Sequence, residues 1–212
     1  SEGTEFFCKG DRELGDSIFH CWRKGGHGTM NIVTALEQSC DVYFYEIALK
    51  TGIQKIRDMA LRLGLGKVTG VDLPGEKSGI IPSHEWKLAA KGVVWTPGET
   101  VVAGIGQGYV LTTPMQLAVM TARIANGKDA VVPSLLSKPI SAGQNFEPLN
   151  ISESALAVIR RGMTSVLYGA AGTANSHKLG KEFGGMAGKT GTVQVKRITL
   201  AQREKGITKN ID

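Results

Sequence analysis

The segment GGMAGKTGT at 184–192 restricts the possible folds of this chain more than any other stretch. A phosphate-binding loop has the pattern G-x-x-x-x-G-K-[ST] between a buried strand and a helix. Counted back from Gly188, the first glycine of that pattern falls on Phe183, and the residues before it are polar. The β-branched residues that follow indicate a strand. The segment therefore excludes a nucleotide-binding loop and predicts a strand region at 183–199 that contains Lys-Thr-Gly-Thr.

Helical patterns dominate the chain before this strand. Helical periodicity recurs in the segments 31–38, 42–52, 53–64, 112–127 and 152–169. The fourth is the best defined, because Thr113, Pro114 and Gly127 occupy its cap, first-turn and end positions. Helices with one late strand predict an α/β (α+β) fold. We expect one partial domain over 1–212, with a loop-rich segment at 1–40, a mainly helical one at 41–182 and the strand region at 183–199.

The charge pattern restricts the partners. The net charge is +6 and the isoelectric point is near 9.3, but the basic residues are scattered and never form a run of five. We therefore expect a solvated basic surface and no nucleic-acid partner. No apolar run approaches 18 residues and Ser1 does not open a signal peptide, so we expect either a cytosolic protein or a piece without its targeting segment.

Two short motifs carry residues suited to acyl-transfer chemistry. Ser39 and Asp41 are two positions apart at a helix junction, where they could face one cleft or simply cap the helices. Lys189 would attract a carboxylate, Gly191 would let a ligand approach the backbone, and the hydroxyl and N–H groups beyond could hold an acyl oxygen. One class of serine enzyme combines S-x-x-K, a Ser-x-Asn type motif and K-T-G. The second and third occur here in that order.

Four segments, at 21–48, 70–83, 105–118 and 187–195, resemble the transpeptidase domain of class B penicillin-binding proteins, specifically penicillin-binding protein 2 of cell elongation. The resemblance implies a penicillin-binding/serine β-lactamase-like fold, in which helices flank an antiparallel sheet. It also implies a D,D-transpeptidase that cross-links D-Ala-D-Ala stem peptides of peptidoglycan through a serine acyl-enzyme and binds β-lactam antibiotics covalently. Elongation-machinery membrane proteins would be partners, at the periplasmic face of the inner membrane.

The same resemblance assigns roles by position. Ser39 would relay protons, and Asp41 would stand where the family usually has asparagine. Lys189 and Thr190 would engage the substrate carboxylate and the Ser39 hydroxyl. Gly191 would border the substrate, and the Thr192 N–H would donate to the oxyanion. No cofactor for catalysis is implied.

The nucleophile of such an enzyme is missing, because no serine in this sequence is followed three positions later by lysine. We expect that motif before Ser1, and further strands after Asp212, so the domain would be trimmed at both ends. This chain alone should then be inactive, because acyl-enzyme chemistry needs a nucleophile. The alternatives are a non-catalytic interaction module with the same fold, or a D,D-carboxypeptidase.

Three cysteines fall within the first forty residues, in the spacing C-x12-C-x5-H-x12-C. We favour a structural zinc ion bound by Cys8, Cys21, His27 and Cys40, because these soft ligands share a segment with few other means of ordering itself. His20 is the alternative histidine ligand. A Cys8–Cys21 disulfide and three free buried thiols are the competing interpretations.

Overall fold

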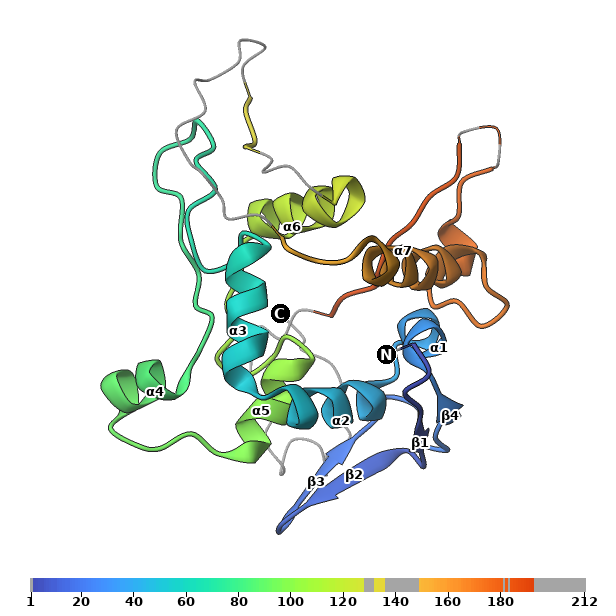
Figure 1. The fold of residues 1–212 in the computed structure, drawn as a ribbon, viewed down its shortest axis with the longest axis horizontal. Coiled ribbons are helices and arrows are strands. Elements are labelled where there is room, and N and C mark those ends of the chain that lie inside the picture. Colours follow the sequence, from blue (N-terminus) through green and yellow to red (C-terminus); the bar gives the residue numbers. More distant parts are fainter. Residues whose placement is uncertain (1, 128–131, 136–148, 181, 183, 193–212) are drawn as a thin grey trace, which may run out of the picture.

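The computed structural model describes residues 2–127, 132–135, 149–180, 182 and 184–192, and Figure 1 draws their arrangement. Strands gather at the N-terminal end of the chain, and helices form the rest. The mixture agrees with the expected combination of helices and antiparallel strands. Among the described helices, none has both the length and the apolar character needed to cross a membrane.

Two small antiparallel sheets occupy the N-terminal region, where we expected mostly loop. β1 (Phe6–Cys8) pairs with β4 (Gly28–Met30), and β2 (Asp11–Leu14) pairs with β3 (Ser17–His20). Gly15 has φ 56° in the two-residue turn of the second pair, a conformation that glycine adopts readily. Each strand has only three or four residues, too few for an alternating pattern to be recognised in the sequence.

The two helical segments around Ser39 are separate helices, as predicted. Asn31 caps α1 (Ile32–Gln38) by accepting the N–H groups of Val33 and Thr34. α1 ends where Ser39 takes a left-handed conformation, and α2 (Asp41–Thr51) begins two residues later. The chain therefore turns sharply at the predicted motif.

Aromatic residues of α2 attach both sheets to this helix. Tyr43 packs edge-on against Phe6 at 5.5 Å between ring centroids, and Tyr45 packs against Phe19 at 5.9 Å. The Tyr45 hydroxyl also donates to the carbonyl oxygen of His20 at 3.0 Å. The buried core around these contacts comprises Cys8, Cys21, Met30, Ala35, Cys40, Val42, Tyr43, Tyr45 and Val101.

Three helices follow along the chain: α3 (Ile53–Arg62), α4 (His84–Lys91) and α5 (Pro97–Gly104). The first was predicted, whereas α4 and α5 were not. α5 lies directly against α2, because a Cβ added to Gly104 would stand 2.3 Å from the Cβ of Ala48. Lys87 of α4 donates to Glu99 of α5 at 2.7 Å and joins the two short helices.

The last two α-helices, α6 (Pro114–Asn126) and α7 (Glu153–Tyr168), confirm the remaining predictions of helix. α7 packs on α1 at the right of Figure 1, and a Cβ at Gly162 would meet Leu36 at 2.5 Å. The short 3-10 helix η1 (Asn175–His177) follows. Residues 189–192 are assigned to no strand, and the rest of the expected strand region, 193–199, lies outside the described residues.

Candidate active site and metal cluster

The four proposed metal ligands meet in one buried cluster. Cys8 ends β1, Cys21 follows β3, His27 precedes β4, and Cys40 separates α1 from α2. Their ligand atoms all lie within 4.8 Å of one another. The His27 Nδ1 atom is 3.4 Å from Sγ of Cys21 and 3.6 Å from Sγ of Cys8. Tetrahedral zinc, with bonds of about 2.3 Å to sulfur and about 2.0–2.1 Å to nitrogen, would separate these atoms by about 3.6 Å. The donor set therefore fits a zinc ion.

Two glycines allow the loops that carry the cluster to pass very close to each other. Gly26 has φ 74°, and a Cβ there would lie 2.2 Å from the carbonyl oxygen of Cys8. Gly10 has φ 111°, and its Cβ would lie 2.3 Å from the carbonyl oxygen of Lys24. The N–H of Cys21 donates to the Gly10 carbonyl at 2.8 Å. Only glycine fits where these two stretches of backbone pass each other, and this crossing holds the loops that carry Cys8, Cys21 and His27 close together.

The sulfur atoms are buried and are not joined in a disulfide. Cys8, Cys21 and Cys40 are at most 4% exposed. A hydrogen bond between Cys21 and Cys40 lowers the pKa of Cys21 and raises that of Cys40, so the pair favours one thiolate, the form that binds metal. The His27 Nε2 atom is buried without a hydrogen-bond partner among the described residues, and its ring packs edge-on against Trp22.

Ser39 and Asp41 flank the cluster on the same turn of backbone. Ser39 has φ 54° and ψ 49°, a left-handed conformation that is uncommon for a residue with a side chain. Asp41 is the first residue of α2, and its Oδ2 accepts the backbone N–H of Trp22 at 2.9 Å. Because Cys40 lies between them, one short turn carries both a candidate metal ligand and the candidate catalytic pair.

Lys189 completes the candidate active site from a distant part of the chain. Its Nζ donates to the Ser39 Oγ at 2.8 Å, across 150 positions of sequence, and lies 3.2 Å from the Thr190 Oγ1. The Lys189 segment is held by α7, since the N–H of Gly188 donates to the carbonyl oxygen of Met163 at 3.1 Å. The structure thus brings Ser39, Lys189 and Thr190 together.

The connection after α7 provides a second attachment that sequence reasoning missed. Thr173 donates its N–H to the Glu37 carbonyl at 3.1 Å, and its Oγ1 lies 3.0 Å from the Thr190 Oγ1. The N–H of Ala171 donates to the Glu37 carboxylate at 3.0 Å. These contacts tie the end of α1 to the Lys-Thr-Gly-Thr segment. No sequence motif marks them, because two of the three involve backbone groups.

Burial shifts the pKa values of Asp41 and Lys189, the two charged groups of the candidate active site. Burial raises the pKa of Asp41 to about 6, although the N–H of Trp22 and the charge of Lys189 act in the opposite direction. Partial desolvation of its ammonium group lowers the pKa of Lys189, and the negative charge of Asp41 partly offsets this effect. The Lys189 residue as a whole stays exposed. A cation with a lowered pKa beside a hydroxyl is suited to holding an anionic ligand and exchanging a proton.

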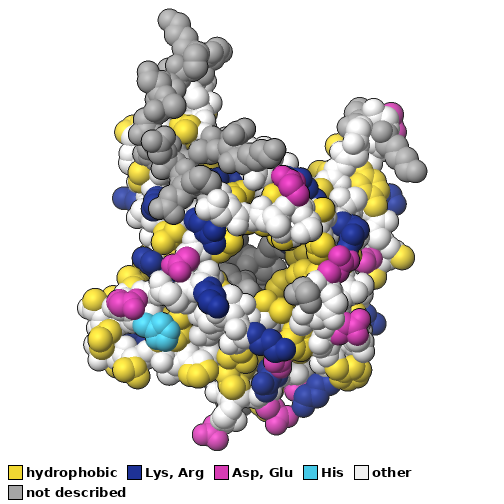
Figure 2. Space-filling model, viewed as in Figure 1, with side chains coloured by type: hydrophobic (Ala, Val, Ile, Leu, Met, Phe, Trp, Pro, Cys, Tyr) yellow, Lys and Arg dark blue, Asp and Glu magenta, His cyan; other side chains and the backbone are white. Residues whose placement is uncertain are grey.

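The two remaining predicted residues lie on the open side of this site. Gly191 and Thr192 are exposed, and a Cβ added to Gly191 would meet nothing within 4 Å. The open space at that Cβ position would let a ligand approach the backbone at Gly191. On the face drawn in Figure 2, the molecule is hollowed near its centre, with hydrophobic side chains along part of the edge.

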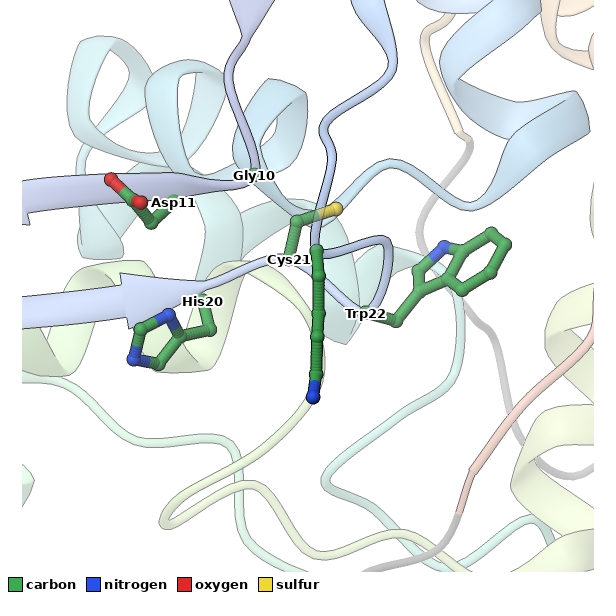
Figure 3. A pocket seen from close by; sticks show the side chains of 6 residues that line it. Gly10, Asp11, His20, Cys21 and Trp22 are labelled. Atoms are coloured by element: carbon green, nitrogen blue, oxygen red, sulfur yellow. The ribbon is translucent and has the colours of Figure 1, made fainter.

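A cavity of about 460 Å³ opens beside Cys21, one of the four clustered ligands (Figure 3). It is lined by Gly10, Asp11, His20, Cys21, Trp22 and Lys24. The side chains of Asp11 and His20 lie on one side of Cys21 in Figure 3, and the Trp22 indole lies on the other. The alternative ligand His20 is exposed and is absent from the group of four converging ligand atoms, which contains His27.

The chain is similar to curated peptidoglycan D,D-transpeptidases. It is 38% identical over 198 residues to MrdA of Acinetobacter baumannii, covering 89% of this chain. It is 34% identical over 182 residues to MrdA of Escherichia coli K12, covering 82%. The chain spans 29% of the length of each of these two relatives.

Solved structures give the same answer for the fold. Penicillin-binding protein 2 (PBP2) of Pseudomonas aeruginosa in complex with WCK 5153 matches with a TM-score of 0.79 and 34% identity, over 83% of this chain and 42% of that one. PBP2 of Helicobacter pylori in complex with MreC matches with a TM-score of 0.76 and 36% identity, over 83% and 33%. The family profile of the penicillin binding protein transpeptidase domain matches residues 1–207. The chain therefore belongs to the penicillin-binding protein transpeptidase family.

Proposed function

We propose that this chain is part of a peptidoglycan D,D-transpeptidase that cross-links D-Ala-D-Ala stem peptides and binds β-lactams covalently. One observation carries the proposal: the Lys189 ammonium lies 2.8 Å from the Ser39 hydroxyl, with Asp41 and Thr190 around them. This arrangement is suited to binding a terminal carboxylate and moving a proton beside it. The similarity to curated D,D-transpeptidases supports the assignment of reaction class.

In the reaction, a serine oxygen attacks the carbonyl carbon of the penultimate D-alanine, and the terminal D-alanine leaves with a proton. The amine of a second stem peptide then attacks the ester, forms the cross-link and returns the serine hydroxyl. Lys189 and Thr190 bind the carboxylate of the terminal D-alanine, and Ser39 passes the proton. The Thr192 N–H donates to the oxyanion. Asp41 fixes the turn that carries Ser39.

The nucleophile is a serine of an S-x-x-K motif outside residues 1–212, because no serine in this sequence meets that pattern. Its hydroxyl would approach the Ser39 and Lys189 groups from the open side of the site. Residues 1–212 therefore supply the proton relay and the carboxylate clamp, and the nucleophile comes from another segment of the same domain.

A structural zinc ion on Cys8, Cys21, His27 and Cys40 is the second part of the proposal. The close set of four ligand atoms and the buried, unbridged thiols support it. The ion would fill its four coordination positions with protein ligands, so it would stabilise the fold and take no direct part in catalysis. Its structural contribution would be to fix Cys40, and hence the turn from Ser39 to Asp41.

Location and partners follow from the proposed reaction. Peptidoglycan is cross-linked outside the cytoplasm, so we place this domain at the periplasmic face of the inner membrane. One solved relative is a complex of PBP2 with MreC from Helicobacter pylori. We therefore expect membrane proteins of the elongation machinery to bind the protein that contains this chain.

A fluorescent penicillin tests the proposal on the full-length protein that contains this chain. The wild type should form an adduct that survives denaturation, and peptide mass spectrometry should place it on the serine of an S-x-x-K motif. Lys189→Ala should reduce the acylation rate by about 100-fold or more, because the carboxylate clamp and proton relay are lost. Lys178→Ala, which removes an exposed lysine next to η1, should leave the rate unchanged.

The products separate the remaining alternatives. Cross-linked dimers from a lipid-linked disaccharide pentapeptide indicate a transpeptidase, whereas release of D-alanine without dimers indicates a carboxypeptidase. Absence of any adduct in the full-length wild type would leave a non-catalytic interaction module and refute the proposed function.

A further inference from the structure

We infer that Trp22 is a positioning residue, which holds the turn at Ser39 in its active geometry through the indole N–H. The inference rests on the proposed function, because it assigns Trp22 a part in that reaction. Trp22 lies in the segment 21–48 that resembles the family, but no motif in the sequence assigns it a role in the site. It comes directly after Cys21, on the loop that carries two of the four clustered ligands.

Three hydrogen bonds join Trp22 to the turn. Its indole Nε1 donates to the carbonyl oxygens of Ser39, at 2.9 Å, and of Gln38, at 3.1 Å. Its backbone N–H donates to the Asp41 carboxylate at 2.9 Å. One residue therefore contacts both ends of the Ser39-Cys40-Asp41 motif, from about 17 positions earlier in the chain.

The two carbonyl groups that accept the indole N–H need a partner. Gln38 is the last residue of α1, and Ser39 follows it, so neither carbonyl has an acceptor role inside the helix. Ser39 also has φ 54°, which costs free energy for a residue with a Cβ and persists only where the surroundings enforce it. Trp22 holds this conformation, because its indole N–H donates to the carbonyl groups on both sides of the Ser39 Cα, those of Gln38 and Ser39.

The exposure of Trp22 indicates a role beyond packing. The residue is 59% exposed, which is far more than a tryptophan that serves the core. The ring is fixed by an edge-on contact with His27, at 5.2 Å between centroids. Trp22 is thus held in place although it is largely exposed, and its main contact with the turn is the indole N–H donor. A shift of the Ser39 carbonyl would rotate the Oγ away from Lys189, with which it shares a 2.8 Å hydrogen bond.

The test replaces the indole N–H and keeps the ring. In the full-length protein, Trp22 is exchanged by amber suppression for 3-benzothienylalanine, in which sulfur takes the place of N–H. Stopped-flow measurements with a fluorescent penicillin separate the initial dissociation constant from the acylation rate constant. We expect the acylation rate constant to fall about tenfold, the effect of one lost hydrogen bond, with the dissociation constant changed less than about twofold.

Three comparisons separate positioning from general stability. 5-Fluorotryptophan at position 22 retains the N–H and should restore the wild-type rate constant. Trp95→Phe removes another indole hydrogen bond, the one to Thr100 Oγ1 at 2.8 Å, and should leave the rate constant unchanged. The zinc content and melting temperature of the benzothienylalanine variant should match the wild type. Trp22→Phe gives the same comparison if suppression yields too little protein.

Several outcomes would overturn the inference. A wild-type acylation rate in the benzothienylalanine variant would show that the N–H is dispensable. A fall that accompanies zinc loss or a lower melting temperature, or that Trp95→Phe reproduces, would show a purely structural contribution. If the unmodified full-length protein forms no adduct, the proposed function fails first and this inference falls with it.

Discussion

Lys189 and Ser39 are 150 positions apart in the sequence, yet the ammonium of one donates to the hydroxyl of the other at 2.8 Å. The contact depends on α7, which packs on α1 and also holds Gly188 through the Met163 carbonyl. The contact therefore needs two things: the left-handed turn that orients the Ser39 hydroxyl, and the packing of α7 on α1, which positions Lys189. Both can be tested by substitutions whose effects on stability and on acylation differ.

Replacing Ser39 should separate stability from activity. Ser39→Gly and Ser39→Ala both remove the hydroxyl, so each should lower penicillin acylation by about 100-fold. Glycine also relieves the left-handed strain at φ 54°, so we expect Ser39→Gly to be more stable than Ser39→Ala by about 1 kcal/mol. Denaturant unfolding and acylation kinetics measure the two effects. Equal stability of the two variants would contradict the assigned strain.

Removing a ligand should release the metal. We expect one zinc ion per purified chain by elemental analysis, and its loss in Cys40→Ser together with a fall of several kcal/mol in the free energy of unfolding. His20→Ala removes an exposed histidine outside the cluster and should retain the ion. Titration with a mercurial should liberate zinc as three thiols react. Fewer than three titratable thiols in the unreduced protein would support the disulfide alternative instead.

The crossing at Gly26 should tolerate no side chain. Gly26→Ala places a Cβ 2.2 Å from the Cys8 carbonyl oxygen at φ 74°, so we expect destabilisation by more than about 2 kcal/mol and weaker zinc binding. Gly25→Ala, one residue earlier, has nothing within 4 Å of the new Cβ and should be nearly neutral. Thermal melts and zinc competition assays on the pair provide the measurement. Similar behaviour of both variants would argue against the close crossing.

The contact between α7 and α1 should be sensitive to one methyl group. Gly162→Ala adds a Cβ 2.5 Å from the Leu36 side chain, so the helices must separate and Lys189 should move from Ser39. We expect slower acylation and a lower melting temperature, although alanine normally stabilises a helix interior relative to glycine. The double variant Gly162→Ala/Leu36→Ala makes room for the methyl group. Its acylation should recover at least in part; no recovery would rule out the steric explanation.

The Lys87–Glu99 pair should make stability fall in acid. Burial disfavours the charged form of Glu99, but hydrogen bonds from Lys87 and Thr96 prevail and lower its pKa. A lowered carboxyl pKa adds stability above the unfolded value, near 4.3, and that stability is lost as the pH falls through the folded value. From pH 7 downward the wild type should therefore lose more of its free energy of unfolding than Glu99→Gln, and the extra loss should occur below about pH 4.3. Exposed Glu5→Gln is the control, and parallel curves for Glu99→Gln and the wild type would contradict the prediction.

The sequence predicted the elements whose signals are local. Thr113, Pro114 and Gly127 mark the ends of α6, and the structure places each in the expected position. α5 has an equally good start, a capping box between Thr96 and Glu99, but its short apolar stretch hid the helix. β1 and β4 were missed because they pair residues some twenty positions apart, such as Phe6 and Met30. β2 and β3 pair locally, but each has only four residues, too few for a recognisable alternating pattern.

Some residues of the candidate site could be recognised in the sequence, and others could not. The metal ligands and the Ser39 and Lys189 motifs are recognisable as residue types, and the structure brings them together. Trp22 and Thr173 were not recognised, because they act through backbone carbonyl groups or through a hydroxyl of another segment. Contacts of this kind leave no pattern in a single sequence. Only the path of the folded chain reveals them.

All four clustered ligands precede residue 41, whereas Lys189 joins the site from far along the chain. A chain that emerges from its N-terminal end can therefore gather its cysteines and histidine long before the helix α7 exists. Local contacts of this kind form early and at low entropic cost, and distant ones form late. The order of synthesis thus favours a nucleus of residues 8–40 that forms before Lys189 joins it. A thiol oxidant acting during that interval would damage the protein before it could acquire any activity.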